Sequence, residues 1–189
     1  MKRLAVYCGA SMGSDPAFAA TARALGEHMA AEGIGLVYGG GRLGLMGVVA
    51  DAVMQNGGEA YGVIPQALID LEVAHTDLTQ LHIVTTMHER KAMMTELTDA
   101  FVAIPGGIGT LDELFEAWSW NALGYHAKPF ALLNVHGFWD RMISFLDHVA
   151  AVGFMSPSRR AQLLIAETIP ETIAKLDAAV GGAEPKMVW

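Results

Sequence analysis

Short apolar runs without polar alternation recur along this chain, and longer stretches with helical character separate them. Continuous apolar runs are typical of strands that are buried on both faces of a parallel sheet. Regular alternation of such strands with helices is the pattern of an open α/β fold. The sequence therefore predicts a single-domain, Rossmann-like doubly wound fold, with a mainly parallel sheet and helices on both of its faces.

The expected elements follow this alternation over almost all of residues 1–189. Strands are predicted at residues 4–8, 35–38, 60–64, 81–85, 101–104, 130–134 and 163–166. Helices are predicted at residues 16–31, 45–55, 87–97, 137–151 and 170–180, and between the glycines at 106–109 and residue 123. Residues 66–80 fit either a loop or a short helix, and residues 181–189 are expected to form a loose tail. Ligands in such folds bind beyond the carboxyl ends of the strands, so the loops there are the first places to search.

Composition excludes several classes of protein. Hydrophobic residues make up 52% and charged residues 17% of the 189, which is a globular composition. The net charge is −8 and no run of Lys and Arg occurs, so a nucleic-acid surface is not expected. Neither a membrane span nor a signal peptide is expected, because the apolar runs are too short. Cys8 is the only cysteine, which excludes an internal disulfide and favours a reducing, cytoplasmic compartment.

A first glycine turn, Gly39–Gly44, has the spacing G-x-G-x-x-G of a dinucleotide-binding loop. That interpretation requires an acidic residue at the end of the next strand to bind a ribose, but this strand ends in Val63-Ile64-Pro65. No Gly-Lys-Ser/Thr follows, so the turn is not a P-loop either. Two alternatives stay open: a tight turn that lets helix and sheet pack closely, or a loop that shapes or contacts a mononucleotide pocket with Arg42.

A second glycine turn runs from Gly106 to Gly109 and is followed by Thr110. The first backbone N–H groups of a helix form an anion site at the positive end of the helix dipole. Glycines there remove the Cβ atoms that would block a phosphate, and Thr110 adds a hydroxyl donor. The turn therefore predicts a site for a monophosphate.

Carboxylates follow this turn at Asp112, Glu113 and Glu116. Thr110 and Glu113 have the spacing of a capping box, in which the glutamate returns a hydrogen bond to the start of the helix. The other interpretation is catalytic, with Glu113 facing a bound ligand. On these residues alone the cap is the simpler interpretation, and Asp112 and Glu116 would be ordinary surface acids.

Two cations, Arg90 and Lys91, lie near the start of the helix predicted at 87–97. The helix dipole disfavours cations at that end, which indicates an anionic partner nearby. If the fourth and fifth strands are neighbours, Arg90 lies beside the second glycine turn. The alternative is a surface ion pair with Glu89 or Glu96, which is more credible for Lys91 than for Arg90.

Four blocks together carry a family resemblance: "VYCGAS" from Val6, "YGGGRLGLMG" from Tyr38, "MHERK" from Met87 and "PGGIGTLDE" from Pro105. They resemble the Lonely Guy family of cytokinin-activating phosphoribohydrolases, with the signature P-G-G-x-G-T-x-x-E matched at every fixed position. The similarity runs from about residue 4 to residue 180. It implies hydrolysis of the N-glycosidic bond of N6-substituted adenosine 5′-monophosphates, or of AMP, to free base and ribose 5-phosphate. It also implies a homodimer and no metal or cofactor.

The resemblance implies that Arg90 and Glu113 are the catalytic pair. The substrate contacts it implies are Glu72, Arg90, Lys91, Gly106, Gly107, Ile108, Gly109, Thr110, Leu111, Asp112, Glu113 and Ser119. Many relatives carry threonine at the position of Ser119, so the hydroxyl is kept. Members are often labelled lysine decarboxylases, but pyridoxal phosphate chemistry needs a Schiff-base lysine and only Lys91 lies in a suitable turn.

Two other functions remain as alternatives. Molybdenum-cofactor carrier proteins resemble this fold and use similar glycine turns to hold a phosphorylated pterin, but a carrier has no need of Arg90 and Glu113. An NAD-dependent enzyme is disfavoured by the missing acid at the strand end. The seven histidines show no spacing typical of metal ligands, so no metal site is expected.

Overall fold

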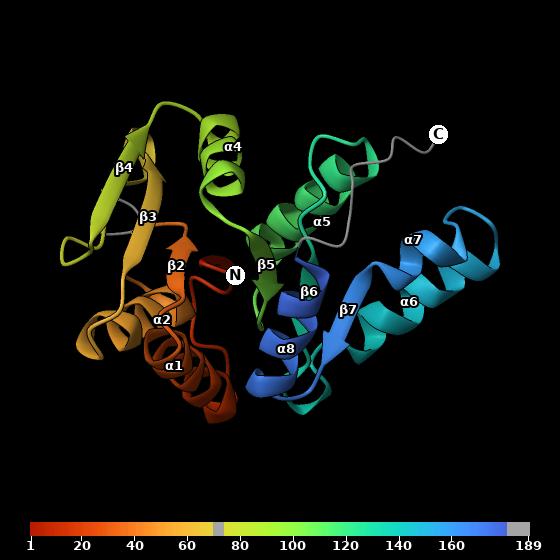
Figure 1. The fold of residues 1–189 in the computed structure, drawn as a ribbon, viewed down its shortest axis with the longest axis horizontal. Helices are drawn as coiled ribbons and strands as arrows, with labels where there is room; N and C mark the ends of the chain where they lie inside the picture. Colours follow the sequence, from red (N-terminus) through yellow and green to blue (C-terminus); the bar gives the residue numbers. More distant parts are fainter. Residues whose placement is uncertain (70–73, 181–189) are drawn as a thin grey trace.

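The computed structural model describes residues 1–69 and 74–180. One sheet of seven strands runs through them in the order β4-β3-β2-β1-β5-β6-β7, and every neighbouring pair is parallel (Figure 1). The strands are β1 (Arg3–Tyr7), β2 (Gly35–Tyr38), β3 (Ala60–Pro65), β4 (Gln80–Val84), β5 (Ala100–Ala103), β6 (Phe130–Leu133) and β7 (Leu163–Ala166). The predicted α/β fold with a parallel sheet is confirmed. That residues 1–189 form one domain stays a prediction.

Helices connect the strands and cover both faces of the sheet. They are α1 (Pro16–Ala31), α2 (Gly44–Gln55), α4 (Met87–Leu97), α5 (Ile108–Ala122), α6 (Asp140–Ala151), α7 (Pro157–Ala161) and α8 (Ile169–Ala179), with short 3-10 turns η1 (Gln66–Leu68) and η2 (Val135–Gly137). Residues of α1, α2 and α8 share one hydrophobic cluster, and residues of α4, α5 and α6 share the other. The doubly wound arrangement follows, because the two clusters lie on opposite faces of the strands.

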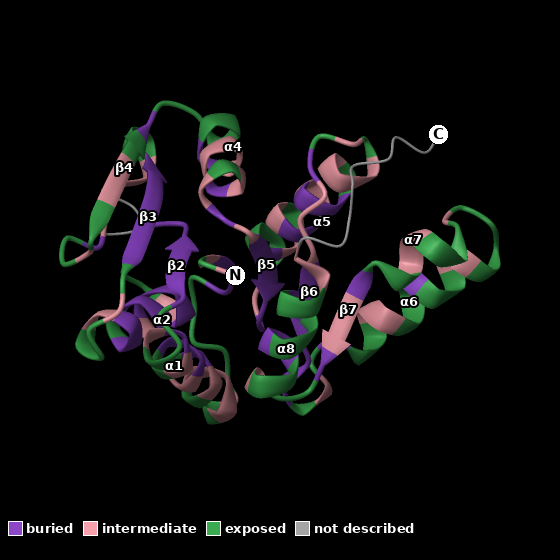
Figure 2. Cartoon of the chain, in the orientation of Figure 1, coloured by how far each residue is buried: buried purple, intermediate pink, exposed green. Residues whose placement is uncertain are grey.

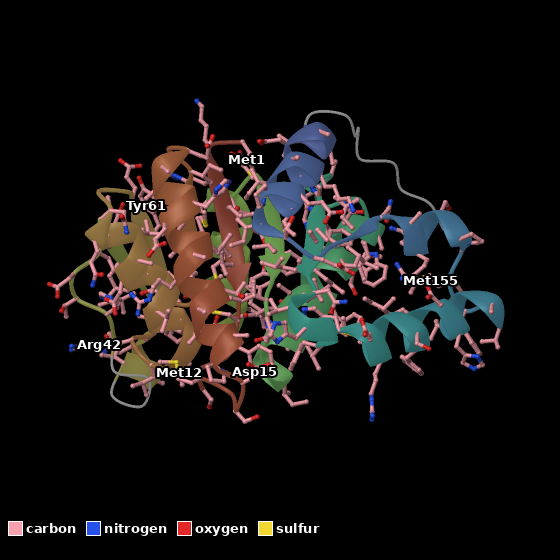
Figure 3. All side chains as sticks on the ribbon, turned by 90° about the horizontal axis from the view of Figure 1, so that it is seen from below. Met1, Met12, Asp15, Arg42, Tyr61 and Met155 are labelled. Carbon is pink, nitrogen blue, oxygen red and sulfur yellow. The ribbon has the colours of Figure 1, made fainter. Side chains whose placement is uncertain are left out.

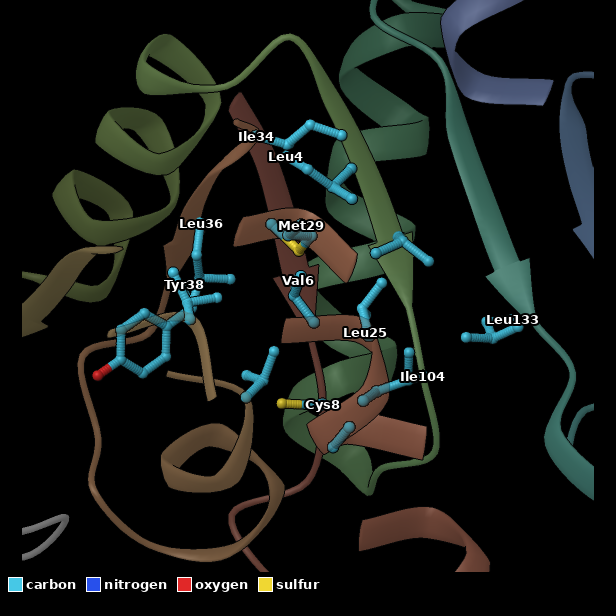
Figure 4. Packing of buried hydrophobic residues seen from close by; sticks show 14 of the residues in the cluster. Leu4, Val6, Cys8, Leu25, Met29, Ile34, Leu36, Tyr38, Ile104 and Leu133 are labelled. Atoms are coloured by element: carbon cyan, nitrogen blue, oxygen red, sulfur yellow. The ribbon is translucent and has the colours of Figure 1, made fainter. Parts of the chain in front are cut away.

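Strand β1 shows how the sheet separates the two clusters. Leu4 and Val6 pack with Leu25 and Met29 of α1 on one face (Figure 4). Tyr7 points to the other face, where its ring stacks on Phe101 at 5.7 Å between centroids. Side chains alternate between the faces of a strand, so a continuous apolar run serves both layers. Figure 2 shows the result as strands that are buried at the centre of the sheet and more exposed at β4.

Capping residues fix where two of the helices begin. Asp15 accepts a hydrogen bond from the Ala17 N–H at 2.8 Å at the start of α1. At α4, the hydroxyl of Thr86 accepts from the Glu89 N–H at 3.1 Å, and the Glu89 carboxylate accepts from the Thr85 N–H at 2.7 Å. This reciprocal pair is a capping box, and it defines the register of the helix that carries Arg90.

Three details differ from the sequence prediction. Helix α6 begins at Asp140 rather than near residue 137, because His136 and Gly137 have positive φ angles of 49° and 71° that interrupt the helix. Helix α7 was not predicted; it is a five-residue helix capped by Ser156. Strands β4 and β5 are not neighbours, since β3, β2 and β1 lie between them. The loose tail predicted at 181–189 lies outside the described residues.

Candidate active site

The strand order reverses direction between β1 and β5, which is where doubly wound sheets form their ligand crevice. From β1 the chain continues to α1 on one face, and from β5 it continues to α5 on the other. The two loops contact each other at the crevice, where the Gly9 N–H donates to the carbonyl oxygen of Pro105 at 3.1 Å. Both loops follow the carboxyl ends of strands that the sequence predicts.

A cavity of about 510 Å³ opens at this crevice. Its walls are the loops after β1 and β5 together with side chains of α4 and α5. Arg90 and Glu113 lie in one part of its lining, and Met12, Phe18 and Phe138 contribute apolar surface. This volume falls in the range of small-molecule sites, and the mixture of apolar wall and few charged groups is typical of them. The three apolar residues were not predicted, although the loop that carries Met12 was.

The start of α5 faces this cavity as an open anion site. Gly107 is the N-cap residue and no side chain caps the helix. A Cβ atom added to Gly107 or Gly109 would meet nothing within 4 Å, and neither glycine has a positive φ. The hydroxyl of Thr110 has no hydrogen-bond partner in the described part of the chain, although the residue is only 2% exposed. The first N–H groups of a helix have no partner within it, so this end is suited to an anion.

The capping-box interpretation of Thr110 and Glu113 is wrong. Helix α5 already begins at Ile108, so Thr110 lies within its first turn and does not cap it. Glu113 lies one turn further on and lines the cavity, with 12% of its side chain exposed. The structure therefore leaves the carboxylate facing the space that a ligand would occupy.

Arg90 reaches the same space from α4. It is 4% exposed, and its Nη2 lies 3.8 Å from Oε1 of Glu113. The same nitrogen donates to the carbonyl oxygen of Gly39 at 3.1 Å. Arg90 is therefore buried beside Glu113 rather than lying in the surface ion pair with Glu89 or Glu96 that the sequence left open, and Glu89 caps α4. The first glycine turn thus shapes the pocket by holding Arg90, while Arg42 is exposed and absent from the cavity lining among the described residues.

Lys91 points to a different set of partners. Its Nζ lies 2.7 Å from the carboxylate of Glu116 and 3.1 Å from that of Asp112. Burial by itself lowers the pKa of Lys91, but the two ion pairs outweigh it and raise the pKa above its ordinary value. Among the described residues that line the cavity, Lys91 is missing. Its predicted contact with substrate stays a prediction.

Two further groups, Tyr7 and Cys8 at the end of β1, remain uncharged near neutral pH. Burial, followed by the negative charges of Glu113 and Glu116, raises the pKa of Tyr7 well above its ordinary value. Burial, followed by the charge of Glu113, also raises the pKa of the Cys8 thiol. Among the described residues, the charged side chains that line the cavity are Arg90 of α4 and Asp112 and Glu113 of α5.

The structure gathers most, but not all, of the residues predicted for the site. Those that line the cavity are Arg90, Gly106, Gly107, Ile108, Gly109, Thr110, Asp112 and Glu113. Leu111 is outside its lining, and Ser119 lines a second cavity of about 460 Å³ with Trp118 and Phe154. Met12, which lines the first cavity, and Met155, which lines the second, lie far apart in Figure 3. Glu72 lies outside the described residues.

Residues 1–69 and 74–180 contain neither a cluster of metal ligands nor a membrane-spanning helix. No group of three or more His, Cys, Asp or Glu side chains is arranged to hold a metal ion. No helix in these ranges is long and apolar enough to cross a membrane.

Known proteins resemble this chain over most of its length. A family model described as "Possible lysine decarboxylase" matches residues 46–176. The cytokinin riboside 5′-monophosphate phosphoribohydrolase LOG of Oryza sativa subsp. japonica is 43% identical over 188 residues, which cover 100% of this chain and 78% of that protein. A protein of Rhodococcoides fascians named cytokinin riboside 5′-monophosphate phosphoribohydrolase is 42% identical over 176 residues, 93% of this chain and 89% of its own.

Solved structures share the fold at lower identity. TM1055, a structural genomics target, superposes with a TM-score of 0.73 at 24% identity and covers 94% of this chain and 99% of its own. A Moco carrier protein from Chlamydomonas reinhardtii has a TM-score of 0.72 at 19% identity and covers 96% and 98%. These likenesses establish the fold alone. The family model and the relatives above 40% identity go further, and with the four motifs they show that the chain belongs to the Lonely Guy family.

Proposed function

We propose that this protein hydrolyses the N-glycosidic bond of adenosine 5′-monophosphates, N6-substituted or plain, and releases the free base and ribose 5-phosphate. The observation that carries the proposal is that an open helix N-terminus and the pair Arg90–Glu113 line one cavity. An anion site and a carboxylate are the two groups that such a substrate requires. The names of the rice and Rhodococcoides relatives support the same reaction.

The phosphate binds at the start of α5 in this proposal. The first N–H groups of the helix and the hydroxyl of Thr110 donate to its oxygens, and the helix dipole favours its charge. Gly107 and Gly109 leave the space that the phosphate needs. Anchoring the 5′ end fixes the sugar relative to Glu113. The entropy that is lost in orienting the sugar is then lost on binding, which lowers the activation free energy of the chemical step.

Glu113 acts at the anomeric carbon. The C1′–N bond breaks with its electron pair going to the base, and positive charge develops on the sugar as an oxocarbenium-like state. The carboxylate stabilises that charge and accepts a proton from the water whose oxygen bonds to C1′; a proton finally resides on the released base. Arg90, whose Nη2 lies 3.8 Å from Oε1 of Glu113, orients the carboxylate.

A product assay tests this proposal directly. The protein is incubated with AMP, N6-isopentenyl-AMP, GMP, CMP and adenosine, and the products are separated by chromatography. We expect base and ribose 5-phosphate from AMP, faster release from the isopentenyl analogue, and little from adenosine because it lacks the anchoring phosphate. Intact nucleotides in the presence of well-folded protein would refute the proposal, and a copurified pterin would then favour a carrier.

Glu113→Gln tests the role of the carboxylate. Loss of a general base lowers the rate by roughly 10²–10⁴-fold. Glu89→Gln is the matched control, because Glu89 is the glutamate that does cap a helix. It should cost at most about 1 kcal/mol of stability and leave turnover intact. Near-normal turnover by Glu113→Gln would remove the carboxylate from the mechanism.

We also propose that the protein works as a homodimer. Phe154 is 90% exposed beside the second cavity, and Tyr125, Phe145 and Val152 add exposed apolar surface in the same half of the chain. Exposed apolar surface of this kind is typical of a contact with another chain. Light scattering after size exclusion should give a dimer that Phe154→Asp dissociates. Leu43→Asp, at an exposed leucine near α2, should leave it intact.

Two further expectations complete the proposal. A nucleotide substrate and a single buried, unpaired cysteine fit a cytoplasmic location, which fractionation of the source cells would test. Substrate contacts by Glu72 and Ser119 stay predictions from the family resemblance.

A further inference from the structure

We propose that His75 is a positioning residue, which fixes the first glycine turn in the orientation that holds Arg90 beside Glu113. The inference rests on the proposed hydrolysis, because it names a residue that supports the catalytic pair of that reaction. Among the described residues that line the cavity, His75 is missing. It therefore acts through the turn and not on the substrate.

The ring of His75 is buried and joins two parts of the chain. The residue is 4% exposed, and its Nδ1 accepts a hydrogen bond from the N–H of Asp77 at 3.3 Å. The ring proton is thus on Nε2, which donates to the carboxylate of Asp51 at 2.9 Å. Asp51 belongs to α2, the helix that follows the first glycine turn. Hydrogen bonds at both nitrogens therefore fix the ring, one within its own loop and one to α2.

The backbone of His75 contacts the turn itself. Its N–H donates to the carbonyl oxygen of Gly40 at 3.0 Å, and the residue before it, Ala74, forms an isolated antiparallel bridge with Gly41. Gly40 has a φ of 75°, in the region that favours glycine. Because glycine rotates about its backbone bonds more freely than other residues, its carbonyl group needs a hydrogen bond to keep one direction. His75 supplies that bond, and its ring anchors the backbone that donates it.

The carbonyl group just before Gly40 is the one that holds Arg90. Nη2 of Arg90 donates to the carbonyl oxygen of Gly39 at 3.1 Å and lies 3.8 Å from Oε1 of Glu113. The two carbonyl groups belong to successive peptide groups that share Gly40, so a hydrogen bond that fixes one restricts the other. The result is a continuous series of contacts from the ring of His75 to the catalytic pair.

Steric contacts alone do not give the turn this orientation. A Cβ atom added to Gly40 would lie 3.2 Å from side-chain atoms of Ile64 and of Leu81, so β3 and β4 limit where the turn can lie. Such contacts leave the direction of a carbonyl group open, whereas a hydrogen bond selects one direction. A displacement of reacting groups by about 1 Å can cost roughly 100-fold in rate. A turn with one contact released should cost less than that.

The experiment uses His75→Ala, His75→Gln and Asp51→Ala in the full chain. For each variant, kcat and KM for AMP are measured together with thermal unfolding. We expect His75→Ala to lower kcat about tenfold with KM within about threefold of wild type, because the phosphate site at α5 is untouched. His75→Gln should restore most of kcat, since its amide can donate to Asp51 in place of Nε2. Asp51→Ala should lower kcat by about threefold, because the ring keeps its bond to Asp77.

His126→Ala is the matched control. His126 is also buried, at 8% exposed, and its Nδ1 also accepts from the N–H two residues further on, that of Lys128, at 3.2 Å. It lies between α5 and β6 and is absent from the cavity lining among the described residues. Its loss should lower stability as His75→Ala does, but leave kcat unchanged.

Three outcomes of these kinetics would overturn the proposal. They are a normal kcat in His75→Ala, a raised KM with unchanged kcat in that variant, and an equal fall in kcat in His126→Ala. If His75→Ala does not fold, Asp51→Ala takes its place in the comparison, because the side chain of Asp51 is 52% exposed and its loss leaves the buried ring intact.

A second measurement does not depend on turnover. The side-chain N–H signals of Arg90 are followed by NMR in ligand-free protein, with Arg90→Lys to identify them. We expect His75→Ala to shift these signals and His75→Gln to return them, while His126→Ala leaves them in place. Unshifted signals in His75→Ala would refute the positioning role. If the wild-type protein hydrolyses no nucleotide, the proposed function fails, while these signals still decide whether His75 positions Arg90.

Discussion

The two glycine turns of this protein use the same residue for opposite reasons. In the turn after β2, Gly39–Gly44, the protein itself occupies the space in which side chains would lie. In the turn after β5, two of the three glycines face nothing at all. A glycine that the fold requires shows a close neighbour or a positive φ. A glycine with neither leaves open space at its Cβ position, which a bound ligand can occupy.

Distances make the contrast concrete. A Cβ atom added to Gly39 would lie 1.9 Å from Nη2 of Arg90. Gly44 has a positive φ of 61°, and a Cβ atom added to it would lie 2.2 Å from the carbonyl carbon of Ala10. At Gly107 and Gly109, apart from adjacent backbone, no heavy atom of residues 1–69 and 74–180 lies within 4 Å of the Cβ position. The first turn is therefore part of the support of the site, and the second is part of its binding surface. Substitutions should separate these roles.

The largest effect is expected from Gly39→Ala. The new methyl group cannot coexist with the guanidinium of Arg90 in its present position, so Arg90 must move away from Gly39 and change its geometry relative to Glu113. Misplacement of a reacting group on this scale predicts a fall in kcat of about 100-fold or more. The readouts are steady-state kinetics on AMP and thermal unfolding of the same samples. A Gly39→Ala enzyme with normal kcat would show that the position of Arg90 is not critical.

The next effect is expected from Gly107→Ala and Gly109→Ala. Both positions have ordinary backbone angles and open space, so alanine should leave stability unchanged or raise it by about 0.4–1 kcal/mol. The methyl group would instead occupy the place of the phosphate, which predicts a rise in KM for AMP of about tenfold, equivalent to roughly 1.4 kcal/mol. Calorimetry and kinetics measure the two quantities separately. Lower stability with unchanged KM would contradict the comparison between the turns.

Two segments with the same capping-box spacing show how far the sequence predicts this site. Thr86 to Glu89 and Thr110 to Glu113 both have the capping-box spacing, yet only the first pair caps a helix. The second helix starts two residues before Thr110, because the chain enters helical geometry directly after Gly107. Local pattern is the same in both cases. What differs is the position of the preceding strand end, which tertiary structure determines.

The proximity of Arg90 to the second glycine turn also depends on tertiary structure. The sequence predicted it on the premise that β4 and β5 are neighbours, and that premise is wrong. Arg90 reaches Glu113 because α4 crosses β3, β2 and β1 on its way from the edge strand to the centre of the sheet. Strand and helix positions follow from apolar periodicity, but the order of strands depends on contacts distant in sequence. The motifs therefore located the residues of the site, while only the fold showed how they meet.

The smallest effect is expected from Thr110→Val, which isolates one hydroxyl of the second turn. That hydroxyl is buried and has no partner in the described part of the chain, so it costs desolvation free energy in the empty protein. Valine keeps the shape and removes the polar atom, so stability should stay level or rise slightly. If the hydroxyl donates to phosphate, its loss raises KM for AMP by about two- to tenfold, the equivalent of a hydrogen bond worth roughly 0.5–1.5 kcal/mol. Thr110→Ser keeps the donor and should keep the wild-type KM. A valine variant that loses stability but binds AMP normally would make Thr110 a packing residue, and the second turn would then resemble the first.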